Sequence, residues 1–363
     1  MAAWRLASEG HRVTALEQFA IDHDRGSSYG ESRIVRRVYP NRLYTRMMGH
    51  AYEMWDRLMA ESEDDALFVR CGGLFFGPSD HPEVVGAEDA LRDNTVPYER
   101  LDAAECRRRH PAFLLEPSET ALYEPSMGYA RASRAVRAAA ALAQRAGATL
   151  RESCAVRRIE QAGDVISVWL HSGERIEADR VILSAGPWAA PLLEELGVAL
   201  PVEVTRQAYV HLMPERDWDS YEPGVFPVWI DAGANAYGFP ALGDVPGVKI
   251  GIHDYGISCS PESVARELTA EDREKAIRYA THRFQSLSTR VSYQKVCLYT
   301  VSPDNDFIID TVPGLPQVML ISACSGHGFK FVPLMGQLAA DFVVQRAAKD
   351  ELSAFRLARF ANA

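Results

Sequence analysis

The first eighteen residues, MAAWRLASEGHRVTALEQ, constrain the fold of this chain more than any other stretch. Residues 1–8 combine an apolar stripe with strong helix formers, so they predict a helix, and Gly10 is a typical helix stop. Residues 13–16 predict a short buried strand that ends at an acid, Glu17. Helix, glycine, strand and acid form the second half of a nucleotide-binding βαβ unit. We therefore expect the strand and glycine-rich turn of the first half to lie before Met1.

Two later stretches also have the pattern of α/β units. Residues 165–186, VISVWLHSGERIEADRVILSAG, predict two strands around a turn and then a fully buried strand ending at glycine. Residues 317–324 predict a second buried strand, which leads through the loop SGHG into a helix over residues 329–347. Apolar residues at helical spacing predict further helices over residues 41–61 and 131–147.

The middle of the chain has a different pattern. Residues 201–256 are rich in strand formers punctuated by Pro and Gly, which predicts an antiparallel sheet, and the segment Thr269–Asp272 resembles a capping box that opens a helix over residues 270–286. Residues 67–78, LFVRCGGLFFGP, predict a pair of strands around two glycines. The order predicts an α/β plus antiparallel fold, in which a nucleotide-binding domain is interrupted by a substrate domain.

Composition excludes several partner classes. The chain of 363 residues is 47% hydrophobic with a formal net charge of −10, which argues against nucleic acid and anionic membranes as main partners. No apolar run approaches the ~20 residues that span a bilayer, and the first residues lack the apolar run of a signal peptide. The six cysteines are scattered without a Cys-x-x-Cys pair, which predicts reduced thiols, no metal site and a cytoplasmic location.

The segment SACSGHGFKF carries the first chemical signal. Glycines around His327 let backbone N–H groups approach a ligand closely, and a following helix adds positive potential. Such a loop suits a phosphate or a ring that becomes anionic, although a tight turn without a ligand has the same pattern. Lys330 follows in the expected first helical turn, where a cation is unfavourable unless an anionic ligand is fixed nearby or solvent screens the charge.

The segment ESRIVRRVYP holds three arginines, Arg33, Arg36 and Arg37. In an extended chain Arg33 and Arg37 share one face, while Arg36 points the other way. The planar guanidinium fork suits carboxylates and phosphates. A solvated basic loop is the other interpretation.

Two strand-like segments carry further reactive side chains. In GVKIGIH, Lys249 and His253 lie on one face of an expected strand among small and apolar residues, which favours a lowered lysine pKa and a catalytic role. A lysine on an edge strand that prevents aggregation has the same pattern. In KVCLYT, Cys297 and Tyr299 share a face, and an isolated buried cysteine is often only a small hydrophobe.

Taken together, these segments resemble the monomeric sarcosine oxidase and N-methyltryptophan oxidase family of flavin enzymes. The resemblance covers essentially the whole chain and is densest in GSSYGESRIVRRVYP, YGFPALGDVPGVKIGIH, KVCLYTVSPDNDFIIDTVPG and SGHGFKF. It implies a glutathione-reductase-like FAD-binding domain with an inserted antiparallel substrate domain, here without its N-terminal strand. It also implies oxidation of a secondary amine next to a carboxylate, with oxygen reduced to hydrogen peroxide and the imine hydrolysed to an aldehyde and an amine.

The resemblance assigns roles to individual residues. Cys297 matches the cysteine linked covalently to FAD, and Lys249 matches the lysine that promotes the reaction of the reduced flavin with oxygen. Arg36 and Lys330 match the pair that grips the substrate carboxylate. Three further residues match pocket residues that position the amine: Tyr237, Tyr299 and His253. Matches to FAD contacts, including Glu17 at the ribose, are Glu17, Ser27, Ser28, Arg33, Val156, Gly186, Trp188, Gly326, His327, Gly328 and Lys330.

One position departs from the family. Two histidines are common where this chain has Ser28 and Tyr29, so redox tuning or oxygen access could differ. The implied domains are an FAD-binding domain (1–66, 130–200 and 297–363) and a substrate domain (67–129 and 201–296). The implied protein is a monomer that takes an amino acid and oxygen, with no nucleic acid or membrane partner.

Two other interpretations remain open at this point. A flavin dehydrogenase of the same architecture would pass electrons to another acceptor, although Lys249 argues against it. The second interpretation is a non-catalytic fragment. A parallel sheet that lacks its central strand loses the stabilisation that several buried side chains would provide. Sarcosine, N-methyltryptophan, pipecolate and sugar-modified amino acids all fit the carboxylate grip.

Overall fold

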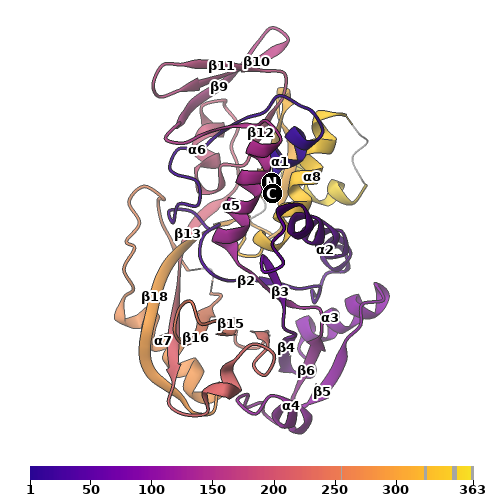
Figure 1. Cartoon of the computed structure of the whole chain (residues 1–363), viewed down its shortest axis with the longest axis vertical. Helices are drawn as coiled ribbons and strands as arrows, with labels where there is room; N and C mark the ends of the chain where they lie inside the picture. The colour runs from indigo at the N-terminus through magenta and orange to yellow at the C-terminus, as the bar shows by residue number, and fades with distance from the viewer. Residues whose placement is uncertain (255, 323–324, 346–349, 361–363) are drawn as a thin grey trace.

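The computed structural model describes residues 1–254, 256–322, 325–345 and 350–360. Helices α1, α2, α5 and α8 gather in one half of the elongated molecule, and the largest sheet occupies the other (Figure 1). The long segment between β1 and α2 runs between the two halves (Figure 1). The fold is therefore α/β with an antiparallel layer, as the sequence predicts.

Three small sheets lie in the helical half. Strands β1 and β8 pair in parallel, and β12 pairs in parallel with β20, which is antiparallel to β19. A third, antiparallel sheet has the order β11-β10-β9. Their bounds are β1 Thr14–Leu16, β8 Thr149–Arg151, β9 Val156–Ala162, β10 Val165–Leu170, β11 Arg175–Ala178, β12 Val181–Leu183, β19 Ile308–Val312 and β20 Leu315–Ser322.

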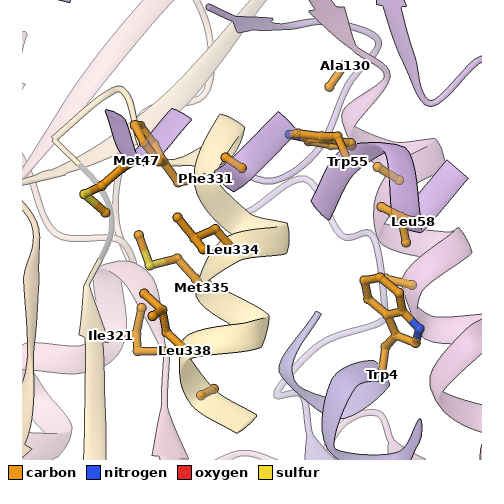
Figure 2. Close-up of a cluster of buried hydrophobic side chains, with 14 of the residues drawn as sticks. Trp4, Met47, Trp55, Leu58, Ala130, Ile321, Phe331, Leu334, Met335 and Leu338 are labelled. Atoms are coloured by element: carbon orange, nitrogen blue, oxygen red, sulfur yellow. The ribbon is translucent and has the colours of Figure 1, made fainter. Parts of the chain in front are cut away.

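A core of large apolar side chains holds these helices together. Trp4 of α1 and Trp55 of α2 are fully buried, and Met335 of α8 packs in the same cluster (Figure 2). Burying a side chain of this size contributes ~1.5–3 kcal/mol, so this cluster fixes α8 and the turn that precedes it. The helices are α1 Ala2–Ser8, α2 Arg42–Ser62, α5 Ala132–Arg145, α6 Ala189–Glu194 and α8 Val332–Val343, and the 3-10 helices here are η1 Gly186–Trp188, η3 Phe329–Phe331, η4 Asp350–Phe355 and η5 Leu357–Phe360.

The other half is built on a nine-stranded sheet of order β17-β13-β16-β15-β14-β4-β6-β5, with β18 also paired to β13. Neighbouring strands are antiparallel except for the parallel pair β14–β4. The strands are β4 Gly73–Pro78, β5 Glu99–Asp102, β6 Glu119–Glu124, β13 Glu203–Pro214, β14 Val228–Asp231, β15 Ala236–Ala241, β16 Val248–Ile252, β17 Ile257–Ser258 and β18 Leu287–Val301.

Helix α7 (Ala270–Arg283) covers one face of this sheet. It begins at Thr269, whose hydroxyl accepts from the Asp272 N–H while the Asp272 carboxylate accepts from the Thr269 N–H, so the predicted capping box is confirmed. The remaining helices are α3 Pro82–Asp93, α4 Ala103–Arg109 and η2 Trp218–Tyr221. A small antiparallel sheet, β2-β7-β3, joins the two halves and consists of β2 Arg33–Val35, β3 Phe68–Arg70 and β7 Gly128–Ala130.

Three local predictions need correction. Residues 67–78 do contain two strands, but β3 pairs with β7 while β4 pairs with β6 and β14, so the strands belong to different sheets. Strand β12 is only half-buried at Val181 and Ile182, because it forms the edge of its sheet. Lys330 lies in η3, and α8 begins two residues later. Cys324 lies outside the described residues.

Among the described residues, no helix has the length and apolar character needed to cross a bilayer. The described residues also hold no group of three metal-ligating side chains.

Candidate active site

Strand register places four of the predicted site residues, Lys249, Tyr237, Cys297 and Tyr299, on one face of the nine-stranded sheet. Side chains directly opposite each other on antiparallel strands share a face, as do residues two apart on one strand. Lys249 of β16 lies opposite His211 of β13 and Phe239 of β15. By the same pairing this face carries Tyr237, Gly251, Gln207, Tyr209, Cys297 and Tyr299. We call it the front face; α7 covers the back face.

Lys249 is buried on the front face, with 4% of its surface exposed. Its Nζ donates to the carbonyl and hydroxyl oxygens of Ser32 at 3.4 and 3.3 Å. Because the side chain is buried and the Arg33 guanidinium is near, the pKa of Lys249 falls well below its ordinary value. Strand β16 lies between β13 and β15, so the edge-strand interpretation of this lysine is wrong.

Cys297 and Arg33 lie beside Lys249. Burial raises the pKa of the Cys297 thiol, while the charges of Arg33 and Lys249 act in the opposite direction. Arg33 donates from Nη2 to the Ser27 carbonyl at 2.9 Å, and the Ser27 hydroxyl donates to the carbonyl of Leu298. The loop before β2 is therefore tied to β18 next to Cys297.

Arg36 and Lys330 form a second cationic pair. The Arg36 guanidinium carbon lies 4.2 Å from the centre of the Tyr39 ring, and the Lys330 Nζ lies 5.5 Å from the same centre. Lys330 is 6% exposed and donates to the His327 carbonyl at 2.8 Å. Burial and the charge of Arg36 hold the pKa of Lys330 well below its ordinary value. The solvated-lysine interpretation is therefore wrong.

Tyr237, Tyr299 and His253 meet at the end of the front face. The rings of His253 and Tyr299 have centroids 5.3 Å apart. Burial raises the pKa of Tyr237 to about 12, and burial with the charges of Arg36 and Lys330 lowers the pKa of His253 to about 4. All three side chains are therefore neutral at pH 7.

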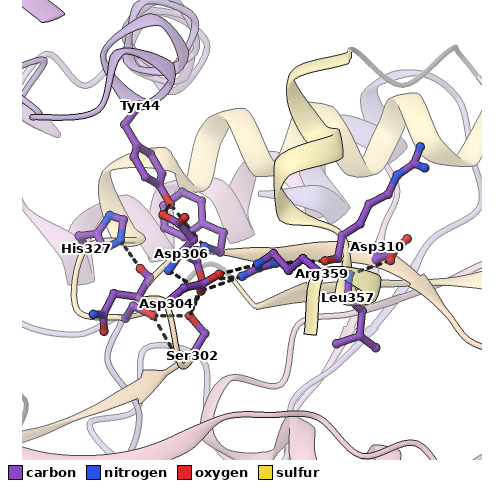
Figure 3. Close-up of polar contacts among 12 residues, drawn as sticks. Tyr44, Ser302, Asp304, Asp306, Asp310, His327, Leu357 and Arg359 are labelled. Carbon is purple, nitrogen blue, oxygen red and sulfur yellow. Dashed lines mark hydrogen bonds and ion pairs between the residues drawn. The ribbon is translucent and has the colours of Figure 1, made fainter. Parts of the chain in front are cut away.

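The 325–328 loop lies directly against these rings. A Cβ added at Gly326 would be 2.5 Å from Tyr299 and 2.6 Å from His253, and its φ of +78° also requires glycine. His327 stacks on Phe307 at 4.7 Å, and its two ring nitrogens lie 3.3 Å from the Tyr39 hydroxyl and 3.1 Å from the Asn305 carbonyl. Figure 3 shows His327 beside the polar network that holds residues 302–306.

The remaining predicted contacts form a second group near β1. Glu17 follows β1 and accepts from the Phe19 N–H at 2.9 Å, and the ring of Phe19 lies 5.4 Å from the Trp188 ring. Gly186 and Trp188 form η1, and Val156 opens β9 just beyond Cys154, whose N–H donates to the Glu17 carbonyl. Ser28 is exposed, and among the described residues it makes no hydrogen bond to β18 of the kind that Ser27 makes, so it is the predicted contact with least support in this geometry.

The unpaired positive charges of this region indicate a ligand-binding site. Arg33, Arg36, Lys249 and Lys330 are part-buried or buried, and none of them forms an ion pair with a described residue. The Nη1 of Arg36 is buried and lacks any hydrogen-bond partner among the described residues. Such groups are costly unless an anion or acceptor meets them. FAD and an amino acid carboxylate supply those acceptors, so the residues present fit both.

Sequence reasoning missed the aromatic and polar residues that surround the cations, namely Ser32, Tyr39, Gln207, Tyr209 and His211. The polar residues at every second position of RQAYVHL signal a front face, but their partners on β16 become visible only with the register.

The chain resembles known proteins over nearly its whole length. It is 32% identical to N-methyl-L-tryptophan oxidase of Shigella dysenteriae serotype 1 (strain Sd197), and 31% identical to the enzyme of the same name from Escherichia coli (strain K12), in each case covering 99% of this chain and 95% of the relative. The solved structure of NikD, described as an unusual amino acid oxidase, has a TM-score of 0.84 at 24% identity and covers 98% of this chain and 93% of that one.

Two structures from further relatives share the fold. L-proline dehydrogenase from P. horikoshii has a TM-score of 0.85 at 22% identity, over 99% of this chain and 94% of that one. Glycine oxidase from Geobacillus kaustophilus has a TM-score of 0.82 at 18% identity, over 99% and 95%. The family profile of FAD dependent oxidoreductases matches residues 1–342. With that match, and with relatives above 30% identity along the whole chain, this protein belongs to the FAD dependent oxidoreductase family.

Proposed function

We propose that this protein oxidises the C–N bond of an N-methyl or other secondary amino acid, reducing oxygen to hydrogen peroxide. The observation that carries the proposal is the adjacent pair Arg36 and Lys330, both around the Tyr39 ring and neither paired with a described carboxylate. Two cations that lie close together in a low-dielectric environment repel each other. A carboxylate ligand between them would offset that repulsion, so the pair fits such a ligand. The names of the most similar relatives support an N-methyl amino acid as substrate.

The residues around that grip would orient the amine. His253 is neutral because its pKa is about 4, so a ring nitrogen can accept a hydrogen bond from the substrate amine or take its proton. The Tyr237 and Tyr299 hydroxyls are also neutral and can hold the nitrogen in place. FAD, when bound, accepts a hydride equivalent from the carbon attached to this nitrogen. Water then hydrolyses the imine to an aldehyde and an amine.

Lys249 would serve the second half of the reaction. A buried cation with no carboxylate partner stabilises negative charge that develops on oxygen, and removing a single oxyanion-hole donor, which stabilises charge in the same way, costs about 10²–10³-fold in other enzymes. Cys297 would hold FAD covalently: burial raises the pKa of its thiol, and the charges of Arg33 and Lys249 oppose that rise and so favour the nucleophilic thiolate form. The group near β1, with Glu17 and Trp188, would bind the ribose end.

The proposed division of the chain follows from these roles. Residues 1–66, 130–200 and 297–363 would form the FAD-binding domain, and residues 67–129 and 201–296 the substrate domain. Strand β18 runs across the last boundary, so Cys297 would attach the cofactor at the junction. The five described cysteines are free, which supports a reducing cytoplasm as the location. We expect a monomer by size-exclusion chromatography.

The function is tested by peroxide release from a panel of sarcosine, N-methyltryptophan, pipecolate and a fructosyl amino acid, each beside its carboxyl ester. Peroxide from one free acid, at least tenfold faster than from its ester, supports the proposal. Anaerobic reduction by substrate without oxygen reactivity would instead identify a dehydrogenase.

The covalent link has its own test. Acid precipitation should leave yellow colour in the wild-type pellet and none in the pellet of Cys297→Ala. Cys106→Ala, which removes another buried free thiol, is the matched control and should keep the colour. Release of all flavin from the wild-type protein would rule out the link.

A further inference from the structure

Among the described residues, Tyr209 on β13 makes the closest cation–π contact with Lys249. The Lys249 Nζ lies 3.9 Å from the centre of the Tyr209 ring and 4.9 Å from that of Phe239. Tyr209 is 5% exposed, so water screens this contact little. A cation at this distance over a ring face is attracted by the ring quadrupole, most strongly where both groups are desolvated.

We propose that Tyr209 is a positioning residue that holds the Lys249 side chain in place and keeps its ammonium group charged. The ring face replaces the carboxylate that a buried lysine ordinarily requires. A carboxylate would neutralise the charge that Lys249 presents to a ligand, whereas an aromatic ring stabilises the cation and leaves that charge available. The consequence for oxygen chemistry rests on the proposed function; the contact itself does not.

The other uncharged groups around Lys249 offer less stabilisation of its ammonium group than the Tyr209 ring does. Ser32 accepts at 3.3 and 3.4 Å, which is long for a hydrogen bond to a charged donor. Arg33 disfavours positive charge on Lys249, while Cys297 and Glu31 favour it. The phenyl ring of Phe239 is a full ångström farther from Nζ than the ring of Tyr209. Tyr209 is therefore the strongest attractive neighbour that carries no charge.

The contact has a measurable pH signature. The chain contains only five lysines, Lys249, Lys275, Lys295, Lys330 and Lys349, so lysine labelled with ¹³C at Cε gives few signals in the holoenzyme. Lys249→Met identifies one of them. Following its shift with pH reports the pKa of Lys249 directly, independently of turnover.

The variants separate ring from hydroxyl. Tyr209→Phe keeps the ring face and should leave the pKa of Lys249 within about 0.3 of wild type, whereas Tyr209→Leu should lower it by about one pH unit. If the leucine variant folds poorly, phenylalanine at position 209 carrying one, two or three fluorine atoms keeps the shape while weakening the quadrupole. The pKa should then fall stepwise along the series. An unchanged pKa in Tyr209→Leu and along the fluorinated series would overturn the proposal.

A second readout links the contact to oxygen. The rate constant for the reduced holoenzyme with oxygen should fall as pH rises through the pKa of Lys249, and in Tyr209→Leu that fall should move about one unit lower, with Tyr209→Phe restoring it. If Lys249→Met leaves the oxygen rate unchanged, the proposed role of the lysine fails while the measured pKa still decides the contact. If Lys249→Met abolishes the rate but Tyr209→Leu does not move the profile, the contact carries no function and the inference fails.

Discussion

The two faces of the nine-stranded sheet use buried cations in opposite ways. On the back face, Arg283 bonds Glu119 through both terminal nitrogens at 2.6 Å and reaches the fully buried Asp231 at 3.0 Å. Arg206 likewise bonds Asp272 and two backbone carbonyls. On and beside the front face the buried or part-buried cations form no ion pair with a carboxylate of the described residues. These cations are Arg33, Arg36, Lys249 and Lys330.

This difference separates structure from function. The charge of a paired buried cation is neutralised by its carboxylate partner, so the pair serves the fold. An unpaired buried cation destabilises the fold until an anionic ligand binds. Removing a paired cation should therefore reduce stability and leave chemistry largely intact. Removing an unpaired cation should do the reverse.

The largest expected loss of stability is on the back face. Arg283→Met leaves Asp231 and Glu119 buried without their partner, so we expect the free energy of unfolding to fall by about 3–5 kcal/mol in urea titrations. The exposed Arg290→Met, on the neighbouring strand, is the control and should change it by less than about 0.5 kcal/mol. A loss below about 1 kcal/mol for Arg283→Met would mean that paired cations are not structural here.

On the front face, removing a cation should have the opposite effect on stability. Lys330→Met removes a buried, unpaired charge of similar length, so we expect stability equal to or about 1 kcal/mol above that of wild type, with a rise in KM of about 10²-fold for the free acid. The ester of the same substrate should lose much less. A variant that is both unstable and unchanged in KM would contradict the comparison.

The front face should also resist further positive charge as pH falls. Burial and Lys249 lower the pKa of His211 to about 3, so between pH 6.5 and about 3 the unfolded chain binds a proton that the folded chain does not. Stability is therefore fully present above pH 6.5 and falls with acid by up to about 1.4 kcal/mol per pH unit from this group. His211→Asn should flatten that slope, whereas the exposed His171→Asn should not.

The smallest effect should come from the tail. Arg359 pairs with Asp304 at 2.7 and 3.0 Å on the network of Figure 3, and both side chains are partly exposed. Arg359→Ala should lower the free energy of unfolding by about 1 kcal/mol or less, measured by thermal unfolding. It should leave the KM for the free acid substrate, which depends on Lys330, unchanged. A large loss of substrate affinity would show that the tail reaches the grip through the loop of residues 302–306.

Sequence spacing was enough where chemistry lies on one strand. Cys297 and Tyr299 are two apart and share the front face of β18, as predicted, whereas β16 ends at Ile252, so His253 lies just beyond the strand on which it was expected to share a face with Lys249. The position of Tyr209 could not be predicted, because register between β13 and β16 is set by tertiary pairing rather than by local pattern. The expectation for residues before Met1 stays a prediction.

The SGHG loop and His253 differ in how far the sequence alone predicts them, again because one depends on local pattern and the other on tertiary contacts. The SGHG loop was predicted to let its backbone approach a ligand closely, which stays a prediction; in the structure Gly326 packs against Tyr299 and His253 and leaves no space for a Cβ. The neutral state of His253 was not predictable, since its lowered pKa depends on burial in the folded protein and on the charges of Arg36 and Lys330, which come from segments about 220 and 80 residues away.

The most direct test of the account separates the two half-reactions by stopped flow. In Lys249→Met, anaerobic reduction by substrate should stay within about tenfold of wild type, while reaction of the reduced enzyme with oxygen falls about 10²–10³-fold. In Lys330→Met the pattern should reverse, with weakened substrate binding and oxygen reactivity near that of wild type. Equal losses of both half-reactions in both variants would contradict the claim that the unpaired cations divide the chemistry between them.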